Sequence, residues 1–397
     1  MAEKTEPESI PGLDPGEGFA ERVILRPEKI ELNGRDPNSL RTELTFSEGL
    51  AEWLHAHGVS IAFTAFNAGG LHLVGQDGSG RVTVVQNRAD GAAGLAYNGR
   101  DLCVGMSASI RVYKNIRTSE SLFEKIFDKL FVPRISYTIS RLDVHELNFD
   151  RSGKLLFANT KYSCVAGLHP THSFTSVWKP LFISKLLSED RCHLNGMAFV
   201  DGELRYVSAF LASDDGWRGK ATDKGVVIDT RANQIVAEGF IKPHSPRFHG
   251  GALWVLDSGR GQLVRIDLAT GARDDVVFIP GFLKGLSFFG KYAVLTSSRL
   301  RKTTADYLEL DESLKSRGLD AWCAVFIVDL DRREVVHWIR LDGLIREMAD
   351  VLFLPDARCP WVGVLTSIGT PLRKPAAVSP QQSATVRRPV SVAAGPG

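Results

Sequence analysis

Short apolar segments alternate with polar turns along most of the chain, and one five-residue phrase recurs among them. Each copy begins with a polar or small residue, continues with a small or acidic residue and ends in an aromatic one. The copies are AGLAY (93–97), HELNF (145–149), NGMAF (195–199), HSPRF (244–248), KGLSF (284–288) and ADVLF (349–353). Their aromatic residues stand roughly 40 to 65 positions apart, a spacing typical of a repeated supersecondary unit.

Each copy is followed by a turn and by further strand-like segments. After HELNF, for example, the turn DRSGK leads into the apolar segment LLFAN. Segments such as LVRID (263–267) and DDVVFI (274–279) supply third and fourth strands. Four short antiparallel strands per unit are the signature of a β-propeller, so six copies predict an all-β, six-bladed β-propeller. The alternative, an irregular β-sandwich, requires six in-register copies by chance.

The last copy shows only two strand-like segments, at 349–353 and 361–367, whereas three segments before the first copy have no unit of their own. These are VSIAFTAF (59–66), GLHLVGQ (70–76) and RVTVVQN (81–87). We therefore expect N-terminal strands to complete the last blade and close the ring, which removes exposed sheet edges.

The two ends differ in composition from the repeat region. Residues 1–40 are rich in Pro, Glu and Gly, and the segment 371–397 is rich in Pro, Ala and Ser with few large apolar residues. Such composition predicts a disordered N-terminal segment 1–40, a propeller over 41–370 and a disordered tail 371–397.

Overall composition is that of a globular protein, with 44% hydrophobic and 24% charged residues and a formal net charge of +2. This balance gives no reason to expect binding to nucleic acid or to a membrane. The sequence has no signal-like h-region and no apolar run near the roughly 18 residues of a membrane span, so we expect a cytoplasmic protein. The five cysteines form no CxxC pair, which argues against a disulfide framework or a cysteine zinc site.

In a propeller the first strand of each blade lines the central channel, so the phrase locates a candidate site. Four of its six first positions are polar, unlike a pure packing position. The first positions are Ala93, His145, Asn195, His244, Lys284 and Ala349. Second positions add Glu146 and Asp350, and His193 precedes Asn195 by two residues. His249 follows the strand, and we expect it to lie towards the other face.

Long loops between second and third strands should reach the same mouth of the channel, and such loops often carry function. One spans 211–225, another 258–262, and the longest, 297–322, has helical composition in its middle. The tryptophan and arginines expected to contact a substrate are Trp217, Arg218, Arg260 and Arg299, with Arg301 beside them.

Three functions are open at this point. His145, Asn195 and His244 could hold one divalent metal ion (Zn, Mn or Fe), with Glu146 or Asp350 as a supporting carboxylate. The metal would then assist a hydrolase, lyase or isomerase acting on a small polar molecule. An ammonium group at Lys284 disfavours a neighbouring cation.

The second function takes Lys284 and the histidines as an electropositive pocket for a small anionic molecule. His145, His244 and Lys284 would then be the catalytic groups, with a histidine as general acid or base. The third function is a non-catalytic scaffold for a protein partner. Nucleotide-binding motifs such as a P-loop are absent from the sequence, so no nucleotide cofactor is expected.

Three segments carry a family resemblance: 134–164 around HELNF, 173–199 ending in HLNGMAF, and 243–259 beginning PHSPRFHG. On them the chain, over about residues 45–370, closely resembles a bacterial family of conserved hypothetical proteins that bear a domain of unknown function, some with tetratricopeptide repeats. The resemblance implies a propeller-like β-domain and no particular activity. A weaker likeness links the chain to lactonase and strictosidine-synthase-like six-bladed propellers. Of the lactonase-type glutamate, paired asparagines and aspartate, only Asn195 has a counterpart here.

Overall fold

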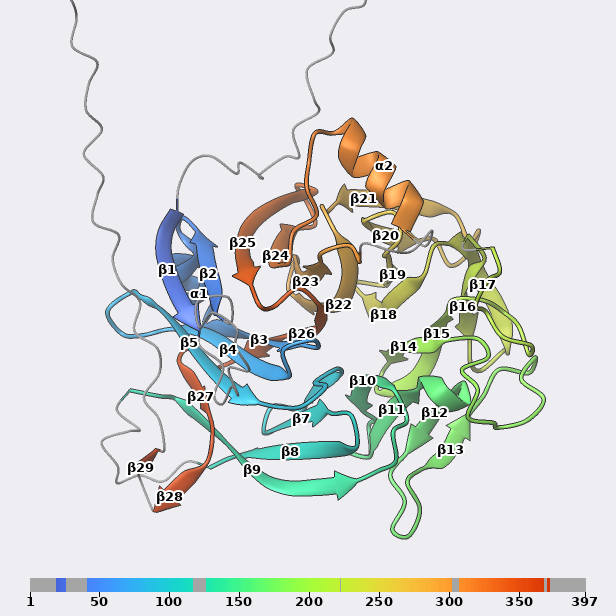
Figure 1. Cartoon of the computed structure of the whole chain (residues 1–397), viewed down its shortest axis with the longest axis horizontal. Helices are drawn as coiled ribbons and strands as arrows, with labels where there is room; N and C mark the ends of the chain where they lie inside the picture. Colours follow the sequence, from blue (N-terminus) through green and yellow to red (C-terminus); the bar gives the residue numbers. More distant parts are fainter. Residues whose placement is uncertain are drawn as a thin grey trace, which may run out of the picture.

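Six β-sheets stand around a central axis like the blades of a propeller (Figure 1). The computed structural model describes residues 19–25, 41–116, 126–221, 223–301, 307–367 and 370–371. Within these ranges the α-helices are α1 (Leu50–His57) and α2 (Leu308–Ser316). No helix in this part of the chain is long and apolar enough to cross a membrane. The predicted all-β, six-bladed β-propeller is confirmed.

Three successive blades each consist of four strands in sequence order, paired antiparallel with the first strand innermost. The first of them has β10 (Val144–Phe149), β11 (Leu155–Asn159), β12 (Cys164–Gly167) and β13 (Thr175–Trp178). The second has β14 (Leu194–Val200), β15 (Glu203–Ala209), β16 (Gly225–Asp229) and β17 (Gln234–Phe240). The third has β18 (Pro243–His249), β19 (Ala252–Asp257), β20 (Gln262–Ile266) and β21 (Arg273–Phe278).

Two further blades are widened at their outer edges by strands from the ends of the described chain. One contains β6 (Leu95–Tyr97), β7 (Asp101–Gly105), β8 (Ser109–Asn115) and β9 (Lys129–Thr138), with β27 (Pro360–Val362) paired parallel to β9. The other contains β22 (Phe282–Phe289), β23 (Tyr292–Ser298), β24 (Ala324–Asp329) and β25 (Glu334–Gly343), followed by β2 (Thr42–Ser47) and β1 (Phe19–Leu25).

The ring closes as expected. The innermost strand of the remaining blade is β26 (Met348–Pro355), and its outer strands are β3 (Val59–Ala65), β4 (Gly70–Gln76) and β5 (Val82–Arg88). The expectation that 361–367 forms the second strand of this blade is wrong, because β3 already pairs with β26. Residues 360–362 instead extend the free edge of β9, and β28 (Leu365–Ser367) pairs with β29 (Thr370–Pro371).

The predicted terminal segments fall largely outside the described residues. β1, at 19–25, lies within the N-terminal segment predicted to be disordered, and it pairs with β2. Residues 1–18, 26–40 and 372–397 lie outside the description.

The core lies between the blades. Strands β3, β4 and β24 are buried along their whole length because neighbouring sheets cover both of their faces. Fully buried rings such as Phe63, Phe157 and Phe326 fill the spaces between sheets. Mostly apolar side chains therefore occupy both faces of these strands.

Candidate functional site

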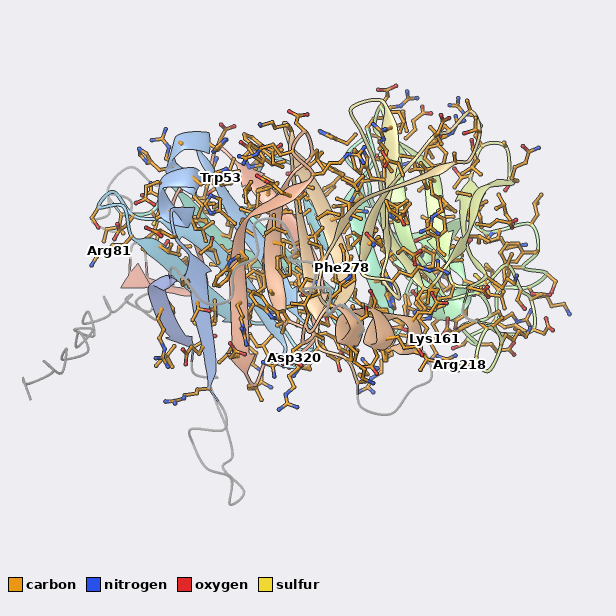
Figure 2. The ribbon with its side chains drawn as sticks, turned by 90° about the horizontal axis from the view of Figure 1, so that it is seen from above. Trp53, Arg81, Lys161, Arg218, Phe278 and Asp320 are labelled. Carbon is orange, nitrogen blue, oxygen red and sulfur yellow. The ribbon has the colours of Figure 1, made fainter. Side chains whose placement is uncertain are left out.

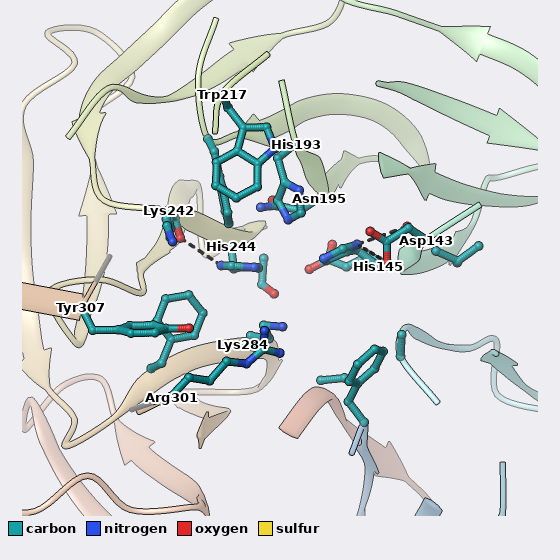
Figure 3. Close-up of a pocket in the computed structure, with 18 of the residues that line it drawn as sticks. Asp143, His145, His193, Asn195, Trp217, Lys242, His244, Lys284, Arg301 and Tyr307 are labelled. Carbon is teal, nitrogen blue, oxygen red and sulfur yellow. Dashed lines mark hydrogen bonds and ion pairs between the residues drawn. The ribbon is translucent and has the colours of Figure 1, made fainter. Parts of the chain in front are cut away.

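The inner strands and the loops beside them line a cavity of about 410 Å³, here called the deep cavity (Figure 3). All six first positions of the repeated phrase line it: Ala93, His145, Asn195, His244, Lys284 and Ala349. The repeat register therefore brings together six residues that are up to about 250 positions apart in sequence.

A second set of lining residues stands two positions before the first set. Asp143, His193, Lys242 and Phe282 all line the deep cavity. The first three have left-handed backbone conformations, with φ of 55°, 51° and 53°. Such a conformation costs a non-glycine residue roughly 1 kcal/mol or more and is concentrated at functional sites. The sequence pointed to His193 alone, although the constant offset of two residues was available as a signal for the others.

His244 lines the deep cavity and has one ring nitrogen without a hydrogen-bond partner among the described residues. Its Nδ1 lies 2.9 Å from the carbonyl oxygen of Lys242 and 2.9 Å from the hydroxyl oxygen of Ser258. Because a carbonyl oxygen only accepts, Nδ1 carries the proton and Nε2 has the lone pair. This Nε2 is buried and has no hydrogen-bond partner among the described residues. Burial, together with the charge of Lys284, holds the pKa of His244 well below its usual 6.5, so the ring is neutral.

His145 is fixed in the same tautomer. Its Nδ1 lies 2.8 Å from Thr160 Oγ1, and that hydroxyl donates to the carbonyl oxygen of Leu194 at 2.6 Å. Thr160 must therefore accept from Nδ1–H, as does the carbonyl oxygen of Asp143 at 3.2 Å. Burial lowers the pKa of His145 to about 4. The ring centroids of His145 and His244 lie 6.3 Å apart, so two neutral imidazoles share the cavity.

Asp190 orients three side chains at the mouth. It accepts hydrogen bonds from His193 Nδ1 at 3.0 Å, Trp217 Nε1 at 2.9 Å and Arg218 at 2.7 Å. Burial alone would raise the pKa of Asp190, but the bonds from His193 and Trp217 and the charge of Arg218 lower it overall. The carboxylate therefore holds these residues in place. Trp217 and Arg218 line the deep cavity, as the sequence predicts.

Cationic and aromatic groups dominate the remaining wall. Lys284 is partly buried, and its ammonium group has no hydrogen bond or ion pair with a described residue. Burial, followed by the charge of Arg301, lowers the pKa of Lys284. The Lys242 ammonium lies 5.5 to 5.7 Å from the ring centroids of Phe210, Trp217 and Tyr307. The cavity thus combines positive charge with flat apolar surface.

Two predicted arginine contacts are absent from the deep cavity. Arg260 donates to Asp257 and to Glu309 of α2, both at 2.9 Å. Arg299 forms an ion pair with Asp342 at 2.5 Å. Neither residue lines the cavity, because these carboxylates hold them in the loop framework. Arg301, in contrast, lines it while pairing with Glu347.

The side chains proposed as supporting carboxylates form a polar floor below the cavity. Glu146 accepts from Arg247 at 2.8 Å and from the backbone N–H of Met197 at 2.9 Å. Asp350 accepts from the N–H of Leu95 at 2.7 Å and lies 4.0 Å from Arg247. Burial, followed by the charge of Glu146, raises the pKa of Asp350 to about 7. These bonds tie both carboxylates to the protein.

Arg247 was missed by sequence reasoning. It is the fourth residue of HSPRF, where the other copies have Ala, Asn, Ala, Ser and Leu, and this exception was the available signal. Besides Glu146, its guanidinium donates to the carbonyl oxygens of Leu286, Met197 and Pro246. The polar floor, defined as Glu146, Arg247 and Asp350, therefore links the inner strands across the channel.

The predicted metal ligands do not form a ready site. Both polar atoms of the Asn195 amide already have a partner, since its nitrogen donates to the carbonyl oxygen of Pro243 at 3.0 Å and its oxygen accepts from Ser208 at 2.6 Å. Among the described residues, no three His, Cys, Asp or Glu side chains are arranged to hold a metal ion together. We therefore derive no step through a metal.

Several solved structures are similar in overall shape. Chains from a nidogen/laminin complex (10% identity, TM-score 0.48) and from a Bacteroides caccae protein of unknown function (11%, 0.46) match over 75% and 74% of this chain, and over 99% and 98% of their own. A streptogramin B lyase (13%, 0.38) matches over 71% of this chain and 76% of its own. At these levels the likenesses carry no functional argument.

No curated protein matches the sequence. The family model of the domain of unknown function DUF4915 matches residues 48–362, which span all six inner strands and the whole deep cavity. The chain therefore belongs to the DUF4915 family.

Proposed function

We propose that the deep cavity is the active site of an enzyme that moves a proton on a small organic anion, as a lyase or isomerase does. The observation that carries this proposal is the buried, unpartnered Nε2 of His244 beside the unpaired ammonium of Lys284. Buried polar atoms are nearly always hydrogen-bonded, so a ligand bound in the cavity would supply the partner that the chain does not give this nitrogen. Titratable groups with shifted pKa values in one cavity are also typical of active sites.

The residues that line the deep cavity would have different roles in this reaction. Lys284 attracts the anionic group. The attraction between the two charges is stronger in a partly apolar cavity than in water, because the cavity excludes water. His244 is neutral at neutral pH and can therefore accept a proton. His193, held by Asp190, supplies a third imidazole at the mouth. The aromatic side chains of Phe210, Trp217, Phe282 and Tyr307 form the flat walls.

The proposed step balances without a further reactant. His244 Nε2 takes a proton from the carbon next to a carboxylate, and the C–H electron pair moves into the carboxylate as an enediolate. Lys284 stabilises the added negative charge. In a substrate with an adjacent C=C bond, the proton then returns to the far carbon of that bond as the double bond shifts, which completes an isomerisation. In a substrate with a β-leaving group, the enediolate electron pair forms a C=C bond while the bond to that group breaks; the group departs with its bonding pair and takes the proton from His244, which completes an elimination.

Deuterium incorporation tests this step even when the product of the reaction is unknown. Purified protein is incubated in D2O with a panel of small carboxylates, and proton loss is followed by NMR. The wild type should exchange the carbon-bound hydrogen of at least one member, and His244→Ala should be slower by about 10²-fold or more. His249→Ala is the matched control, because His249 stacks on Phe288 outside the deep cavity and donates to Gly290.

Metal assistance is the second candidate, favoured by the histidines whose Nδ1 atoms are anchored, as in many metal centres. Elemental analysis of the purified protein decides between the two. About one equivalent of Zn, Mn or Fe, lost in both His145→Ala and His244→Ala without unfolding, would replace the metal-free step. A panel that neither binds nor exchanges, on a metal-free protein, would favour a scaffold for a protein partner instead.

A further inference from the structure

The deep cavity continues sideways into a second hollow. This hollow, here called the vestibule, has a volume of about 510 Å³. It shares five lining residues with the deep cavity: Phe66, Ala93, Asp143, Val144 and Arg218. Figure 2 shows Lys161 and Arg218, which both line the vestibule, at the same face of the propeller. A ligand can therefore occupy both hollows at once.

The direction of this extension follows from the repeat. Four blades place a polar side chain larger than alanine at the first position, but the blades of β6 and β26 place Ala93 and Ala349 there. Gly91, with φ of 62°, stands two positions before Ala93. The equivalent positions in two other blades are occupied by Asp143 and Lys242. Small residues thus leave the wall open beside Ala93, and the vestibule begins there.

The vestibule contains cations without partners. Arg141 and Lys161 line it, and neither side chain forms an ion pair with a described residue. Its acidic residues Glu189 and Asp190 are instead paired with arginines, Glu189 with Arg191 at 2.8 Å and Asp190 with Arg218 at 2.7 Å. The half-exposed side chain of Asp143 lines both hollows where the deep cavity meets the vestibule. Its carboxylate repels negative charge from this junction.

We infer that the substrate is an elongated organic dianion, with one anionic group at Lys284 in the deep cavity and the other at Arg141 and Lys161 in the vestibule. An uncharged aliphatic or planar segment passes Ala93 and Asp143 between them. This inference rests on the proposed function and specifies its substrate class. Carboxylate and phosphate are both compatible with the second position, because both accept from Arg and Lys.

Calorimetric titration with acetate, succinate, adipate and suberate tests the inference on the wild-type protein. The affinity should rise by about tenfold or more from acetate to one of the longer dicarboxylates. A matching series of alkyl monophosphates and phosphorylated carboxylates distinguishes the preferred anionic group. Arg141→Gln/Lys161→Gln should remove that gain and leave acetate affinity unchanged.

Two variants complete the design. Ser107→Phe, at an exposed position that lines the vestibule but not the deep cavity, should hinder the long dianions and spare acetate. Lys154→Gln/Arg265→Gln removes two exposed cations elsewhere and should change neither. Dianions that bind no tighter than acetate, or a gain that survives Arg141→Gln/Lys161→Gln, would overturn the inference and leave the proposed function standing. Failure of every anion, acetate included, would overturn both.

Discussion

Replacing Arg247 with methionine tests whether the polar floor holds the propeller together. The substitution keeps an extended side chain but removes the charge and five donors. It leaves Glu146 and Asp350 inside the channel, with side chains only 6% and 1% exposed. Three carbonyl oxygens lose a donor as well. Two like charges in a poorly solvated channel then have no compensating cation.

The magnitude follows from this geometry. Removing one partner of a buried ion pair costs about 3–5 kcal/mol, because the remaining charge stays buried. For a chain of this size each kcal/mol lowers the melting temperature by roughly 2 °C, so Arg247→Met should melt about 6–10 °C below the wild type. The deficit should grow with pH. Asp350, whose pKa is raised to about 7, is protonated at low pH and loses little, whereas at higher pH it must ionise without Arg247.

Thermal unfolding followed by circular dichroism at about pH 5 and about pH 8 measures both effects. Arg265→Met is the matched control, because Arg265 is half exposed and pairs with Asp274 on the surface. Its melting temperature should change by about 2 °C at most. An Arg247→Met protein that melts within about 2 °C of the wild type, or with the same deficit at both pH values, would refute the role of the floor.

Three further results are expected. Lys284→Met should raise the melting temperature by a few degrees in thermal unfolding, since it removes a partly buried charge that has no ion pair, while weakening anion binding in calorimetry. Anion affinity in the wild type should stay constant from about pH 6 to about pH 8, because lowered pKa values keep His145 and His244 neutral. An affinity that rises as the pH falls through about 6.5 would show that an imidazolium binds the anion instead. The pKa of Asp350 is raised from 3.8 to about 7, so the folded protein holds an extra proton between these pH values. The free energy of unfolding therefore falls as pH rises through that window, and chemical denaturation should show a weaker dependence of this free energy on pH for Asp350→Asn.

The fold was accessible from sequence because a propeller repeats a local pattern. Each phrase contains an inner strand, and the two-residue alternation of strands fixes which residues face the channel. The same register placed His145, His244 and Lys284 in one cavity. β27 was misassigned because a three-residue apolar strand pairs with whichever edge is free, and that edge is known only once the ring has closed.

The chemistry of individual side chains was less accessible. Asn195 lines the deep cavity as predicted, but Ser208 engages its amide oxygen. Arg299 does not line the cavity, because it pairs with Asp342. Asp190 was missed because its role depends on contacts with both His193 and Trp217, and Trp217 lies in a loop 27 positions after Asp190. Such partners come from distant parts of the chain, so no local sequence spacing predicts them.

Calorimetric titration of adipate into the wild type beside Lys284→Met and His244→Ala tests the proposed anion site most directly. We predict saturable binding to the wild type, weakened about tenfold or more in Lys284→Met, because a charged hydrogen bond contributes about 1.5–3 kcal/mol. His244→Ala should bind more weakly as well, while His249→Ala should match the wild type. Equal affinity in all four proteins would place the anion outside the deep cavity and contradict the proposed function.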